Sequence, residues 1–96
     1  MLAFKKIKVG KKYIQGVAIT LLKHNLVLLR GSRGYIMCGY LDMAVADRFR
    51  DIAVKITGVN TIGDAIKSKV HSLSRAASKA GIYKGQAVKK VLKIIV

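Results

Sequence analysis

The segment from residue 13 to residue 29 constrains the fold most strongly, because it reads as two strands that are apolar on both faces. In the longer strand, one face carries Tyr13, Gln15, Val17, Ile19 and Leu21, and the other carries Ile14, Gly16, Ala18, Thr20 and Leu22. A strand with one face in water shows apolar residues alternating with polar ones. We therefore expect both faces to be covered, one by the chain's own helices and the other by a neighbouring subunit.

The N-terminal half predicts an antiparallel meander. Apolar residues alternate with lysines early in the chain, which is typical of a half-exposed strand. Glycines at both ends of the segment 31–34 permit the positive φ angles of a tight connection. The expected strands are residues 4–9, 13–22, 26–29 and 35–40, and the expected turns are residues 10–12, 23–25 and 31–34.

The C-terminal half reads mainly as helix. Asp42 is a good N-cap for a first helix, followed by Val45, Ala46, Phe49, Ile52 and Ala53 at helical spacing. Residues 54–59 alternate and predict a fifth strand. Three further helices are expected. The first runs from Thr61 to Lys69 or Val70, and the second is capped by Ser72 and ends at Gly81. The third covers residues 85–95, with Val88, Val91, Leu92 and Ile95 on its apolar face.

These elements predict a single α+β domain over residues 1–96. A mainly antiparallel N-terminal meander is followed by C-terminal helices packed on one face. A chain of 96 residues buries only about 60 to 65% of the surface of its unfolded state. Yet 52% of its residues are hydrophobic, and apolar surface beyond the core's capacity usually enters a subunit interface. We therefore expect a homo-oligomer that assembles through the β-region.

The net charge of +15 is the strongest compositional signal, with four acidic residues against 19 basic ones. Such a charge concentrates polyanions near the protein. A basic nucleic-acid-associated protein is therefore one hypothesis, with Tyr13, Tyr35, Tyr40 and Tyr83 available for stacking and with Arg30, Arg33, Lys89, Lys90 and Lys93 as candidate contacts. The charges are spread along the chain, however, and no RNP motif, zinc finger or RGG run accompanies them. A solvated basic surface explains the same pattern.

The block from Gly34 to Asp42 is the most natural place for a site, because it holds the only cysteine, a glycine hinge and a capping aspartate. The candidate ligand-binding residues are Tyr35, Met37, Cys38, Gly39 and Asp42. A non-enzymatic ligand-binding or interaction module is the first hypothesis. An enzyme or redox sensor using Cys38 is another, because a helix dipole and Arg30 or Arg33 nearby would favour the nucleophilic thiolate. In the simplest alternative, Cys38 only fills space and Asp42 only caps a helix.

Several other site types lack support. His24 and His71 have no partners at metal-ligand spacing, so we expect no metal, and no motif calls for a cofactor. The turn at residues 31–34 offers backbone N–H groups and a guanidinium to a phosphate but lacks Walker spacing.

The sequence also bears on where the protein is located. One cysteine allows no internal disulfide, and residues 1–12 do not resemble a signal peptide. Lys23 interrupts the most apolar region. We therefore expect a cytoplasmic protein without a membrane span.

The block from Gly34 to Asp42 resembles the YunC-like family of small archaeal and bacterial proteins. Two further stretches carry the same resemblance, residues 58–62 and the segment from Ala80 to Gly85. The resemblance covers roughly residue 13 to the end of the chain. It implies an α+β fold whose N-terminal β-region mediates tetramer formation, and it implies no catalytic residues, because the family is a domain of unknown function.

Overall fold

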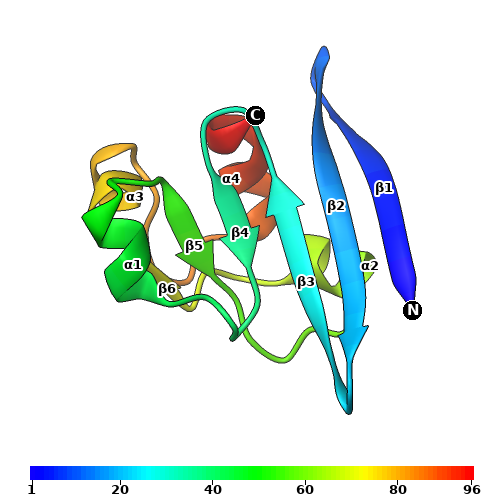
Figure 1. Ribbon diagram of the computed structural model, residues 1–96. Coiled ribbons are helices and arrows are strands. Elements are labelled where there is room, and N and C mark those ends of the chain that lie inside the picture. The colour runs from blue at the N-terminus through cyan, green and yellow to red at the C-terminus, as the bar shows by residue number, and fades with distance from the viewer.

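The computed structural model describes all residues 1–96 and consists of one sheet of six strands with four short helices (Figure 1). The elements are β1 (Leu2–Val9), β2 (Lys12–Leu21), β3 (His24–Arg30), β4 (Tyr35–Met37), α1 (Met43–Arg48), β5 (Ala53–Lys55), α2 (Ile62–Lys67), β6 (Ser72–Leu73), α3 (Arg75–Lys79) and α4 (Val88–Ile95). The order of the strands in the sheet is their order in the chain. The predicted α+β fold is confirmed.

Strands β1 to β4 form the predicted antiparallel meander. The turn between β2 and β3 begins one residue earlier than expected, because Leu21 pairs with His24 and only Leu22 and Lys23 lie between them. Leu22 adopts a φ of 43° and is fully exposed. Residues 38–40, predicted as the end of the fourth strand, lie outside β4.

Strands β4 and β5 pair in parallel, which the sequence did not predict. It arises because α1 connects the two strands, and a crossover connection brings the chain back in the same direction. The first helix is shorter than its apolar spacing predicted: Ala46 is its one buried residue, Phe49 is 68% exposed, and Ala53 belongs to β5.

The two faces of the sheet are covered differently. The main core lies between the sheet and the helices α2, α3 and α4, and it includes Ile14, Val27, Leu29, Ile36 and Val54 from the strands. Figure 1 shows α2 and α4 behind the sheet and α1 in front of it, at the end away from β1. A small second cluster of Leu41, Ala46 and Ala53 holds α1 against β4 and β5. The front of β1, β2 and β3 therefore carries no helix.

The final helix buries the four residues predicted for its apolar face, although it begins at Val88 instead of residue 85. The prediction of a helix capped by Ser72 is wrong, because Ser72 and Leu73 form the short strand β6. The cap of α3 is Ser74, which is fully buried. None of the four helices has the length and apolar character needed to cross a membrane.

Candidate functional site

The front face of β1 to β3 is an open apolar surface. Strand alternation places Phe4, Val17, Leu28 and Met37 in one row across four neighbouring strands, and it places Leu2, Ile19 and Leu26 in a second row. Phe4 is 73% exposed and Leu2 is 64% exposed, while the other five are partly buried. We call these seven residues the open face.

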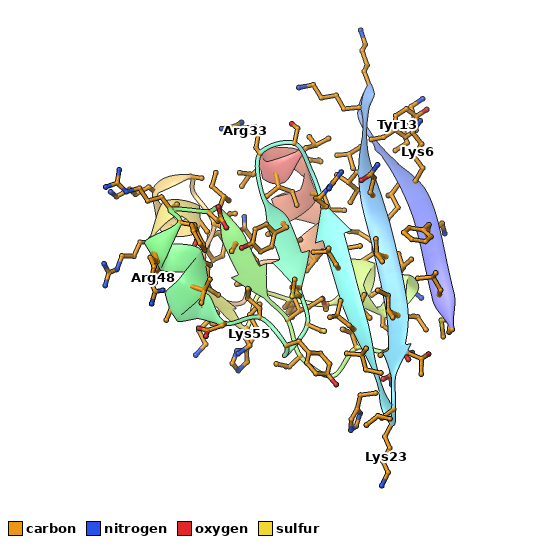
Figure 2. All side chains as sticks on the ribbon, in the orientation of Figure 1. Lys6, Tyr13, Lys23, Arg33, Arg48 and Lys55 are labelled. Atoms are coloured by element: carbon orange, nitrogen blue, oxygen red, sulfur yellow. The ribbon has the colours of Figure 1, made fainter.

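The polar end of the same surface lies near the β1–β2 turn. Lys6, Gln15 and Arg30 follow the apolar rows along the three strands. The Lys6 ammonium lies 4.6 Å from the centre of the Tyr13 ring, and Figure 2 shows the two side chains together at this end of the sheet. The cation–π contact keeps this charge at the rim, beside the apolar rows and not within them.

A cavity of about 450 Å³ lies next to the single cysteine. Its lining residues come from the start of β3, from the segment after β4 and from the segment after β5: His24, Asn25, Cys38, Gly39, Tyr40, Gly58, Val59 and Asn60. The Asn25 side-chain amide donates to the Asn60 carbonyl at 2.8 Å and joins two of the walls. We call this the Cys38 cavity.

The Cys38 thiol is held by the backbone of β3. Its sulfur accepts from the Val27 N–H at 3.3 Å and lies 3.9 Å from the Asn25 carbonyl oxygen, to which it donates. Cys38 is 5% exposed. Arg30, expected to activate this thiol, lies at the opposite end of β3, about 10 Å further along the strand, and Arg33 follows it in the β3–β4 hairpin. Both line a separate cavity.

Within the block from Gly34 to Asp42, the residues that line the Cys38 cavity are Cys38, Gly39 and Tyr40. Gly39 lines it together with Cys38, but Met37 belongs to the open face and Tyr35 contacts Asp51. Asp42 is the N-cap of α1, as predicted, and accepts from the N–H groups of Ala44 at 3.0 Å and Val45 at 3.4 Å. The candidate ligand-binding set is therefore divided among four places.

Four further lining residues were not predicted from the sequence: Asn25, Tyr40, Val59 and Asn60. Asn25 and Asn60 are separated by 35 residues, and only the pairing of β3 with β4 and of β4 with β5 brings them together. The one signal in the sequence was the Gly58–Val59–Asn60 stretch that contributes to the family resemblance. Gly58 adopts a φ of 70° there and turns the chain along the cavity wall.

The predicted nucleic-acid contacts lie on two elements. Lys89, Lys90 and Lys93 project from the exposed side of α4, whose other side packs in the core. Arg30 and Arg33 line a cavity at the β3–β4 hairpin together with Arg50, which was not among the predicted contacts. No group of three or more His, Cys, Asp or Glu side chains is arranged to hold a metal ion.

Tyr35 donates its hydroxyl to Asp51 Oδ2 at 2.9 Å. Burial of the phenol, the hydrogen bond and the negative charge of Asp51 together raise the pKa of Tyr35 from 10.0 to about 12. Between pH 10 and pH 12 the unfolded chain has lost this proton while the folded chain retains it. The free energy of unfolding therefore decreases as the pH rises through this window.

Tyr35→Phe is expected to remove the tyrosinate absorbance that appears near pH 12 in the folded protein. It is also expected to make the stability less dependent on pH between 10 and 12, because phenylalanine has no proton to lose. Ultraviolet titration at 295 nm and urea unfolding at several pH values measure the two effects. An unchanged titration curve at high pH would contradict the assignment to Tyr35.

The strands and helices define a small α+β domain. A protein family described as "Domain of unknown function (DUF1805)" matches residues 37–95, and the chain belongs to this family. This match and the Bacillus subtilis relative described next confirm the predicted resemblance to YunC-like proteins.

Two relatives are similar over most of the chain. The uncharacterized protein YunC of Bacillus subtilis (strain 168) is 31% identical over 80 residues, which cover 79% of each chain. The crystal structure of a protein of unknown function, TA1206 from Thermoplasma acidophilum, is 35% identical and superimposes with a TM-score of 0.96 over 100% of this chain and 94% of that chain.

Proposed function

We propose that the protein is a non-enzymatic, homo-oligomeric module whose subunits assemble, as a tetramer, through the open face. The observation that carries the proposal is the pair of apolar rows across the front of β1 to β4. Apolar patches of this kind on a small domain mark interaction surfaces. Helices α2, α3 and α4 cover the opposite face, and α1 covers only the front of β4 and β5, so the front of β1 to β3 is the surface left for a second subunit.

The charge distribution supports assembly through this face. At a net charge of +15, two copies repel each other unless their charges stay hydrated at the edge of the contact. The centre of the open face carries no charged side chain, and Lys6 and Arg30 lie beyond its end. Subunits packed through the apolar rows would therefore keep these charges at a solvated rim, as is usual in protein interfaces.

Within this module, the Cys38 cavity is the proposed binding site for a small polar molecule. Its volume of about 450 Å³ is within the range of small-molecule sites. The His24 imidazole, the Asn25 amide and the Tyr40 hydroxyl offer hydrogen bonds from its walls. Because the backbone already engages the buried Cys38 sulfur, the proposed binding is non-covalent.

Leu28→Glu is expected to dissociate the oligomer, because it introduces a carboxylate at the centre of the open face. Thr57→Glu is the matched control, since it adds the same charge at an exposed loop position. Native mass spectrometry at moderate salt measures the subunit number of each variant, and circular dichroism verifies the fold.

The proposal requires a tetrameric parent protein, a tetrameric Thr57→Glu variant and a folded Leu28→Glu variant of lower subunit number. A monomeric parent protein at micromolar concentration would overturn the assembly. A tetrameric Leu28→Glu variant would overturn the choice of this face. A small adduct retained by the parent and lost in Asn25→Leu would support the Cys38 cavity as its site.

A further inference from the structure

A second cavity gathers arginines from separate parts of the chain. Arg30 comes from the end of β3, Arg33 from the β3–β4 hairpin and Arg50 from the segment after α1, and all three line one cavity of about 390 Å³. Asp51 is the one acidic residue in its lining. Figure 2 shows Arg33 at the tip of the hairpin and Arg48 on α1, the two elements that border this region.

The backbone around this arginine cavity is fixed from three sides. The hairpin is closed by a hydrogen bond from Gly31 to Gly34, and the Arg33 N–H donates to the Ile95 carbonyl at the end of α4 at 2.9 Å. The Tyr35 N–H donates to the Ile52 carbonyl at 3.0 Å. These contacts hold the chain segments that carry Arg33 and Arg50 in a defined relation, so little ordering of the backbone would accompany binding.

Arg50 has a backbone conformation that is unfavourable for its residue type. Its φ is 60°, in the left-handed region, at the end of a helix where glycine or asparagine is usual. Arg50 also lines a neighbouring cavity of about 260 Å³ with Arg75, Lys79 and the acidic residue Asp47. An arginine thus occupies a strained position beside other cations, and strained residues of this kind cluster at ligand sites.

We propose that the arginine cavity binds the terminal phosphate of a phosphomonoester. Three guanidinium groups and one carboxylate leave an excess of two positive charges, which matches the charge of about −2 on a phosphomonoester near neutral pH. Guanidinium groups form paired hydrogen bonds with phosphate oxygens. Only one oxygen of the Asp51 carboxylate would face the bound phosphate, because its Oδ2 accepts a hydrogen bond from the Tyr35 hydroxyl. The proposal does not rest on the Cys38 cavity, and it shares only Arg30 with the rim of the proposed subunit contact.

The test is isothermal titration with inorganic phosphate at constant ionic strength, above the second pKa of phosphate. Saturable binding at millimolar phosphate is expected for the parent protein. Arg33→Gln is expected to weaken binding about tenfold, because it removes one charged hydrogen-bonding group. Lys84→Gln is the matched control, since it removes the same charge from an exposed position outside the cavity and should leave binding unchanged.

Arg50→Gly gives a second readout that a merely structural role would not produce. Glycine accepts the left-handed conformation without strain, so the variant should melt at a higher temperature than the parent while binding phosphate about tenfold more weakly. A higher melting temperature also shows that the loss of binding is not a loss of folding.

Three results would overturn the proposal. The first is the absence of saturable phosphate binding. The second is equal weakening by Arg33→Gln and Lys84→Gln, which would reduce the effect to net charge. The third is a competition result in which an oligonucleotide without terminal phosphates displaces phosphate more effectively than a phosphomonoester does, when both are compared at equal concentrations of phosphate groups. That result would assign the arginines to a nucleic-acid backbone.

Discussion

Ser74→Ala is expected to lower the free energy of unfolding by about 2 to 4 kcal/mol, because one buried hydroxyl satisfies three backbone groups. Its oxygen accepts from the N–H groups of Ala53 at 3.0 Å and Ala77 at 3.1 Å, and it donates to the Asp51 carbonyl at 2.6 Å. These groups belong to the start of β5, the first turn of α3 and the segment before β5. Alanine leaves all three without this partner in a region from which water is excluded.

Ser78→Ala is the matched control, since Ser78 is exposed in the same helix. Its stability should stay within about 0.5 kcal/mol of the parent. Urea unfolding followed by circular dichroism, at one fixed protein concentration, measures both variants. Equal stability losses in the two variants would show that Ser74 contributes no more than an ordinary helix residue.

Gly34→Ala is expected to destabilise the protein by about 3 kcal/mol or to prevent folding. A Cβ atom at this position would lie 2.5 Å from the Ile52 carbonyl oxygen and 2.9 Å from the Ile52 side chain. The carbonyl is a backbone group that already accepts from the Tyr35 N–H, so it cannot move aside without breaking the connection between the hairpin and the segment before β5.

Gly39→Ala tests whether the effect depends on this contact. A Cβ atom at Gly39 would meet no heavy atom within 4 Å, and its φ is not positive. We expect no loss of stability in this variant. Thermal melting of both proteins, with soluble expression as a first indicator, measures the difference. A well-folded Gly34→Ala variant with the melting temperature of the parent would contradict the close packing described for the hairpin.

The sequence predicted the elements whose pattern is local. Strands β1, β2 and β3 alternate with period two and are joined by short turns, so their faces and approximate register could be anticipated. The apolar side of α4 follows the helical period. Ser74 was missed as the cap of α3 because two of its three hydrogen-bond partners, Asp51 and Ala53, are more than 20 residues away in the sequence. From the local sequence alone, Ser72 is an equally suitable cap.

The candidate site was predictable only in part, for the same reason. Cys38 and Gly39 do line a cavity, but its other walls depend on the pairing of distant strands. Tyr35, only three residues before Cys38, lies in a different environment beside Asp51 and lines the arginine cavity. Arg50 lines the arginine cavity with a left-handed φ angle, for which an arginine gives no sequence signal.

Exposed lysines at the outer edge of β1 restrict how copies of the chain can associate. It is the first strand of the sheet, and Lys5, Lys6 and Lys8 are all exposed along it. A second β1 adding to this edge would bring rows of ammonium groups together, which opposes sheet extension from molecule to molecule. Growth into fibres is thereby disfavoured, and contacts through a face can end in a closed particle with a fixed number of chains.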